Sequence, residues 1–88
     1  MNANRRKQLN EIMNMIADLD SMRADIMERL EGIRDDEQDA FDNLPEGIQE
    51  TDRGDMMQEA IDNMESALDD LDSIDFEAIS DYIAEAQA

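Results

Sequence analysis

Apolar residues recur every three or four positions over residues 9–33, which is the spacing of one face of an α-helix. In heptad notation, position a falls at 9, 16, 23 and 30, and position d falls at 12, 19, 26 and 33. Aliphatic residues occupy all of these positions except Arg23, namely Leu9, Ile12, Ile16, Leu19, Ile26, Leu30 and Ile33. Methionines flank the series at Met13, Met15, Met22 and Met27. The apolar face is therefore wider than a two-stranded seam needs, as in a helix that contacts two neighbours in a bundle.

The first helix is predicted to cover about residues 4–43 and to end before Pro45, because a residue that precedes proline disfavours the helical conformation. A connector follows at residues 44–52, within the segment NLPEGIQETDRGD. Thr51 or Asp52 is a candidate N-cap for the next helix, since short polar side chains accept hydrogen bonds from the free N–H groups at a helix start.

A second helix is predicted over about residues 53–87. Its apolar positions again alternate spacings of four and three, at Met57, Ile61, Met64, Leu68 and Leu71. Continuing this register places Asp75 at a core position, so the helix either curves or breaks near residues 73–75. In the second case Ser73 or Asp75 caps a short third helix.

Two long helices joined by a short connector predict an all-α antiparallel hairpin, with one domain over residues 1–88. Such a hairpin leaves the flanking methionine face exposed, so two hairpins are expected to pair into a four-helix bundle as a homodimer. The predicted core and self-association residues are Leu9, Ile12, Ile16, Leu19, Met22, Ile26, Leu30, Ile33, Met57, Ile61, Met64, Leu68 and Leu71.

The composition removes several classes of chemistry. The chain has no cysteine and no histidine, which excludes disulfides, the usual zinc sites and catalysis by thiol or imidazole groups. The run ALDDLDSIDFEA departs from an EF-hand loop at Ala67, Asp72 and Ala78, so no metal site is predicted. No hydroxyl stands beside a plausible base, and a small hairpin offers little concavity. We expect neither enzymatic activity nor a cofactor.

The net charge of −18 is distributed unevenly along the chain. Residues 1–34 carry six basic and six acidic groups, whereas residues 35–88 carry nineteen acidic groups and one basic group, Arg53. The field of the second part disfavours direct binding to nucleic acid or to an anionic membrane, and it favours a basic partner.

The segment from Glu37 to Asp55, EQDAFDNLPEGIQETDRGD, resembles a family of short acidic proteins from phages and bacterial mobile elements. Members of that family carry an N-L-P-E-G-hydrophobic-Q connector, then a Ser or Thr shortly before Arg-Gly, and then a helix similar to the one that begins at Asp55. The flanking helices match only in style, and no functional residue is transferred. The resemblance implies a mobile-element setting, in which small acidic proteins often antagonise host nucleic-acid enzymes.

The carboxylates of the second helix are the candidate binding residues. Solubility alone requires only a few charges, and −18 without interleaved lysines costs stability through repulsion. Rows of carboxylates on a helix can occupy a groove that evolved for phosphates. The candidate partner-binding residues are Asp55, Glu59, Asp62, Glu65, Asp69, Asp70, Asp72, Glu77 and Asp81.

These features predict a small acidic interaction protein that mimics nucleic acid and blocks the basic groove of a host nucleic-acid-processing or defence protein. The alternative is a homo-oligomeric coiled-coil structural or adaptor protein whose acidity serves solubility. The expected partners are a basic protein and a second copy of the chain. The apolar part of the opening residues is interrupted by polar ones, unlike a signal peptide or membrane span, so a cytoplasmic location is expected.

Overall fold

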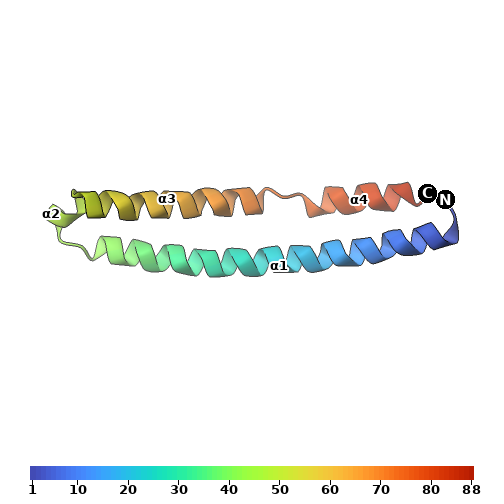
Figure 1. Cartoon of the computed structure of the whole chain (residues 1–88), viewed down its shortest axis with the longest axis horizontal. Helices are drawn as coiled ribbons and strands as arrows, with labels where there is room; N and C mark the ends of the chain where they lie inside the picture. The colour runs from blue at the N-terminus through green and yellow to red at the C-terminus, as the bar shows by residue number, and fades with distance from the viewer. The chain divides into compact units, whose positions relative to one another are not determined.

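The computed structural model describes residues 1–88, of which 86% are in helices and none in strands, so the all-α prediction is confirmed. The helices are α1 (Ala3–Asp42), α2 (Glu46–Gln49), α3 (Asp52–Asp72) and α4 (Phe76–Ala86) (Figure 1). Contacts divide the chain into a first unit, residues 1–25 with 74–88, and a second unit, residues 26–73. The single helix α1 contributes its beginning to the first unit and its end to the second. None of the helices combines the length and apolar character needed to cross a bilayer.

The connector in the second unit contains a one-turn helix, α2, that the sequence pattern did not predict. α1 ends at Asp42, and the Pro45 carbonyl accepts hydrogen bonds from the N–H groups of Ile48 (2.8 Å) and Gln49 (3.1 Å). The Gln49 side chain donates to the carbonyl oxygens of Phe41 (3.1 Å) and Leu44 (3.2 Å). Because the last carbonyls of a helix have no partner within the helix, this side chain closes the end of α1.

Thr51 occupies the N-cap position of α3, as one of the two predicted alternatives had it, but its side chain does not cap the helix. Its hydroxyl donates to the Ile48 carbonyl oxygen at 2.5 Å instead. The threonine thus ties α3 back to α2, and its carbonyl oxygen accepts the first hydrogen bond within α3, from the Asp55 N–H at 3.0 Å.

Gly54 explains how α2 and α3 pack closely together. It is buried, and a Cβ atom added there would overlap the Gln49 carbonyl oxygen and lie 2.6 Å from the carbonyl carbon. Backbone atoms cannot give way as the end of a flexible side chain can. Glycine is therefore required at this position for the close approach of the two helices.

Replacing Gly54 by alanine is expected to lower the free energy of unfolding by about 2 kcal/mol, because the added methyl group must push the α2 backbone away from α3. Gly32 provides the matched control, since it lies inside α1 with no atom within 4 Å of its added Cβ. There the same change is expected to stabilise the helix by about 1 kcal/mol. Urea unfolding followed by circular dichroism measures both, and equal effects of the two changes would contradict the packing explanation.

The chain breaks between α3 and α4, which decides between the two predicted alternatives. α3 ends at Asp72 and α4 begins at Phe76. The Asp75 side chain accepts a hydrogen bond from the Ala78 N–H at 2.9 Å, so Asp75 is the N-cap of α4. The Ser73 hydroxyl donates to the Asp70 carbonyl oxygen at 2.8 Å. The break removes Asp75 from the core position that a continuous helix would give it.

Arg23, the exception in the predicted apolar series, packs against the start of α4. Its guanidinium carbon lies 5.3 Å from the centre of the Phe76 ring, and its Nη2 donates to the Asp20 carboxylate at 2.6 Å. A cation above an aromatic face is attracted by the ring, and a planar guanidinium can stack there while keeping its hydrogen bonds. The charged residue therefore contributes to the packing of the first unit.

The half-buried positions of α1 differ from the predicted core. They are Leu9, Met13, Ile16, Asp20, Arg23, Met27, Leu30, Arg34, Glu37, Gln38 and Phe41. This series contains the predicted a positions 9, 16, 23 and 30. It pairs them with the positions four residues later (13, 20, 27 and 34) instead of with the predicted d positions, which lie three residues later. The d residues and Met22 are exposed within the chain, at Ile12, Leu19, Met22, Ile26 and Ile33. Their assignment to a core within one chain is therefore corrected.

The connector accounts for this choice of face. The chain leaves α1 through Phe41 and Leu44, both half-buried, and Gln49 binds the carbonyl oxygens of these same two residues. Both residues continue the series with alternating spacings of four and three that starts at Leu9. Because the connector is short, α3 returns along the face of α1 on which these two residues lie.

The second helix of the predicted hairpin supplies the most buried residues. Ile61 is 1% exposed and Leu68 is 6% exposed, and Met57, Met64 and Leu71 are half-buried. The predicted positions of α3 thus all face α1. In the first unit Phe76 is the buried residue of α4, followed by half-buried Ser80, Ile83 and Gln87.

Candidate interaction surfaces

In each unit the contact between α1 and its partner helix separates two sides that differ in chemistry. In the first unit Arg6 donates to the Gln87 carbonyl oxygen (3.1 Å) and Arg23 stacks on Phe76, so α1 and α4 run antiparallel. Successive residues of an α-helix are rotated by about 100°. In an antiparallel pair, residues rotated from the contact in the same sense therefore lie on the same side of the pair.

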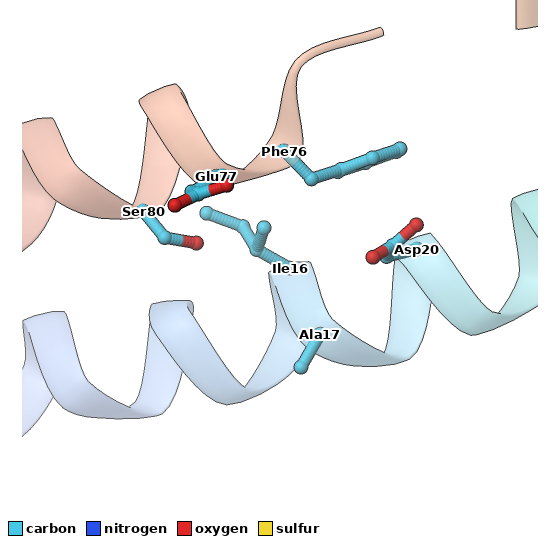
Figure 2. A pocket seen from close by; sticks show the side chains of 6 residues that line it. All are labelled: Ile16, Ala17, Asp20, Phe76, Glu77 and Ser80. Carbon is cyan, nitrogen blue, oxygen red and sulfur yellow. The ribbon is translucent and has the colours of Figure 1, made fainter. Parts of the chain in front are cut away.

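A shallow depression in the first unit, shown in Figure 2, illustrates this geometry. Its volume is about 200 Å³, and residues of both helices line it: Ile16, Ala17 and Asp20 from α1, and Phe76, Glu77 and Ser80 from α4. Ala17 and Glu77 are both rotated by about 100° from the contact in the same sense, and they meet in one depression. Its polar groups are two carboxylates and one hydroxyl, and no hydrogen bond joins Ser80 to either carboxylate.

The side that carries Glu77 is acidic, and all of the predicted partner-binding carboxylates are exposed. In the second unit Asp62, Glu65, Asp69 and Asp72 are rotated from the α1 contact in this same sense, Asp55 and Glu59 point away from α1, and Asp70 is rotated in the other sense. In the first unit Glu77 and Asp81 are rotated in the same sense. The structure thus brings most of the predicted residues of each unit onto one side.

The carboxylates of α3 are spaced much like the phosphates of one nucleic-acid strand. Seven of them lie between Asp55 and Asp72, a distance of about 26 Å along the helix at 1.5 Å per residue. This is one charge per about 4 Å, compared with one per roughly 3.4 Å for a single strand of DNA. Ion pairs at Asp20 and Asp35 are made within α1. No group of three or more carboxylates is arranged to hold a metal ion.

The opposite side is apolar, and its main part is a row of exposed residues on α1. We call this row the apolar stripe: Ile12, Met15, Leu19, Met22, Ile26 and Ile33. Met15 is 68% exposed and Met22 60% exposed, although both are large apolar side chains. An apolar row of this length on one helix face marks an interaction surface more often than chance exposure does.

Two depressions along the apolar stripe have the shape that a second helix requires. One, of about 370 Å³, is lined by Ile12, Met15, Ile16 and Leu19. The other, of about 250 Å³, is lined by Met15, Asp18, Leu19 and Met22. Each set has the spacing i, i+3, i+4, i+7, which is the four-residue hole that receives one side chain of a facing helix in coiled coils.

Comparison with protein-family models, curated protein sequences and solved structures finds no match to this chain. The two sides of the molecule are therefore interpreted from their own geometry and charge.

The prediction from sequence missed two residues of α4 that extend the apolar side. Ile79 is 42% exposed and Tyr82 is 73% exposed. Both are rotated from the α1 contact in the same sense as the apolar stripe, with Ala86 continuing the row at spacings of three and four. The sequence carried this signal in the spacing of Ile79, Tyr82 and Ala86, but the predicted self-association residues ended at Leu71.

Proposed function

We propose that this chain is a non-enzymatic interaction protein whose acidic side occupies the basic groove of a nucleic-acid-processing or defence protein and excludes nucleic acid from it. The observation that carries the proposal is the row of exposed carboxylates on α3, spaced at about 4 Å along a rigid helix. Arg53 is the one basic residue of α3 and α4. The resemblance of the connector adds a phage or mobile-element setting, with the host cytoplasm as the place of action.

Binding of this kind has a recognisable dependence on salt. Charges on an exposed surface steer association and are screened over about 8 Å at physiological ionic strength. The complex is therefore expected to form rapidly at low salt and to dissociate as salt rises. DNA competes for the same groove and displaces the protein.

The test is affinity capture from host lysate at low salt, with elution by a salt gradient and by added DNA. The expected result is a nucleic-acid-binding protein that both treatments release. Substituting Asp62, Glu65, Asp69 and Asp70 by lysine is expected to abolish its capture while the helical circular dichroism signal remains, because all four side chains are exposed.

A matched control places the same change of charge elsewhere on the molecule. Lysine at Glu11, Asp18, Asp25 and Asp36 alters four exposed carboxylates of α1, each rotated by about 130° or more from its contact face. This variant is expected to keep capturing the partner, with weaker binding from the lower net charge. Equal loss in both variants means that net charge alone attracts the partner, and unchanged capture by the α3 variant contradicts the proposal.

A second candidate function is favoured by the apolar stripe. In this view the chain is a homo-oligomeric structural or adaptor protein, assembled by pairing two chains into a four-helix bundle, and its acidity serves solubility. The exposed row from Ile12 to Ile33 supports it, since pairing two chains would bury this row. Within each unit the apolar stripe and most of the acidic residues are rotated from the helix contact in opposite senses, so self-association through the stripe leaves the acidic side of that unit open.

A further inference from the structure

We propose that the apolar stripe of α1 binds the apolar stripe of a second copy of this chain, with the two α1 helices antiparallel and Leu19 of each copy opposite Met22 of the other. The inference rests on the self-association described as the second candidate function and adds its surface, orientation and register. It is independent of the acidic side.

The occupant of the stripe is a helix. The two four-residue depressions described above share Met15 and Leu19, and each has the spacing of a hole in knobs-into-holes packing. The chain's own α4 lies against the other half-buried face of α1, where Arg23 stacks on Phe76, so it does not fill these holes. The same stripe that forms the holes carries side chains of a suitable size to enter them.

The charges along α1 are complementary to those of a second, antiparallel α1. Arg5, Arg6 and Lys7 lie near its beginning, and Asp35, Asp36 and Glu37 lie near its end. Both groups are about 22 Å from the middle of the row between Leu19 and Met22. An antiparallel pair therefore places each basic group beside an acidic group of the other copy, whereas a parallel pair places like charges together.

Pairing through α1 also avoids the repulsion that the net charge would otherwise cause. Residues 1–34 have no net charge, and the excess of −18 belongs to residues 35–88. In each unit most of the carboxylates of the helix that packs on α1, such as Asp69 on α3 and Glu77 on α4, are rotated from the contact in the sense opposite to the stripe, so they remain in solvent in the dimer. A symmetric contact between identical patches is also the commonest way in which soluble chains self-associate.

The proposed register is the one that places Met22 and Ile26 of the second copy at the two holes, and it leaves Ile33 opposite Gln8. With Leu19 opposite Met22, Met15 lies opposite Ile26, and Ile12 lies opposite Arg29. Met22 and Ile26 of the second copy then enter the two holes. Arg29 covers Ile12 of the other copy with its aliphatic stem, and its charged end reaches toward Glu11 of that copy.

The first test is the mass of the full-length protein, measured by sedimentation equilibrium over a range of concentrations. The expected result is a monomer–dimer equilibrium, with a mass that rises from that of one chain to that of two as the protein concentration increases. Leu19→Glu is expected to raise the dimer dissociation constant about 100-fold or more, since it places two carboxylates in the contact. Ser21→Glu adds the same charge to an exposed position on the acidic side of α1 and is expected to leave the constant nearly unchanged.

The second test determines the orientation of the two α1 helices by disulfide cross-linking. The chain has no cysteine of its own, so each cross-link comes from the introduced residues. Met15→Cys and Ile26→Cys are made as separate variants. In the proposed register, disulfide-linked dimers form on oxidation only when the two variants are mixed. Cross-links within each variant alone would show a parallel pair, which overturns the orientation but leaves self-association standing. A monomer at every concentration overturns the inference and the second candidate function. A dimer indifferent to Leu19→Glu overturns the inference alone, and in both cases the acidic-side proposal stays open to its own test.

Discussion

Replacing Ile61 by alanine is expected to lower the free energy of unfolding by about 2–5 kcal/mol, which is the usual cost of removing a large aliphatic side chain from a closed core. Ile61 is 1% exposed, and only Leu68 and Phe76 accompany it among the buried apolar residues. A chain of this size has a total stability of roughly 5–15 kcal/mol. The loss of one side chain therefore removes a large share of it.

The measurement is chemical unfolding followed by circular dichroism, with Met56→Ala as the control. Met56 lies on the same helix, α3, and is 71% exposed, so its truncation is expected to change the free energy of unfolding by about 0.5 kcal/mol or less. We therefore predict that Ile61→Ala lowers the free energy of unfolding much more than Met56→Ala does. Similar losses in both would mean that α3 packs on a face other than the one that contains Ile61.

The sequence predicted two long helical segments and the end of the first, and it left open whether the second segment breaks near residues 73–75. Pro45 stops α1 near Asp42, and Asp75 caps α4, because both effects depend on residues within one turn of the helix end. The turn of α2 was missed because its stability comes from longer-range contacts. The Gln49 side chain donates hydrogen bonds to the carbonyl oxygens of Phe41 and Leu44. Gly54 of α3 has no side chain, so the α2 backbone at Gln49 can pack directly against it.

The face of α1 that packs within the chain could not be chosen from periodicity alone. The series through Ile12 and Leu19 is more apolar than the series through Met13, Asp20 and Met27, yet the less apolar series forms the contact. The deciding residues lie at the end of the helix, where Phe41 and Leu44 direct the connector. Arg23 and Asp20 are tolerated in the contact because they bind each other and Arg23 covers an aromatic ring.

The same reassignment changes how the candidate site is understood. The carboxylates of α3 are exposed as predicted from their positions between the apolar residues. Their separation from a continuous apolar side was not predicted, because it depends on which face of α1 is covered. The wide apolar face inferred from the flanking methionines therefore consists of two rows, one used within the chain and one left exposed.

Replacing Phe76 by alanine is expected to cost about 3–5 kcal/mol and to act mainly on the first unit. Phe76 is the buried residue at the start of α4, and its ring lies under the Arg23 guanidinium at 5.3 Å. Truncation removes both the buried ring and the cation–π contact, which leaves α4 attached chiefly through Ile83 and the hydrogen bonds of Gln87 with Arg6 and Met13.

Amide hydrogen exchange resolved along the chain measures where this loss occurs. We expect protection to fall in α4 and in the first part of α1, while α3 stays protected around Ile61, because the contacts of the two units are largely separate. Phe76→Leu is the control, since it keeps an apolar side chain and loses only the aromatic face, at a cost of about 1 kcal/mol. An equal fall of protection in all helices would instead show that the chain opens as one cooperative unit, in which case Phe76 stabilises α3 as strongly as it stabilises α4.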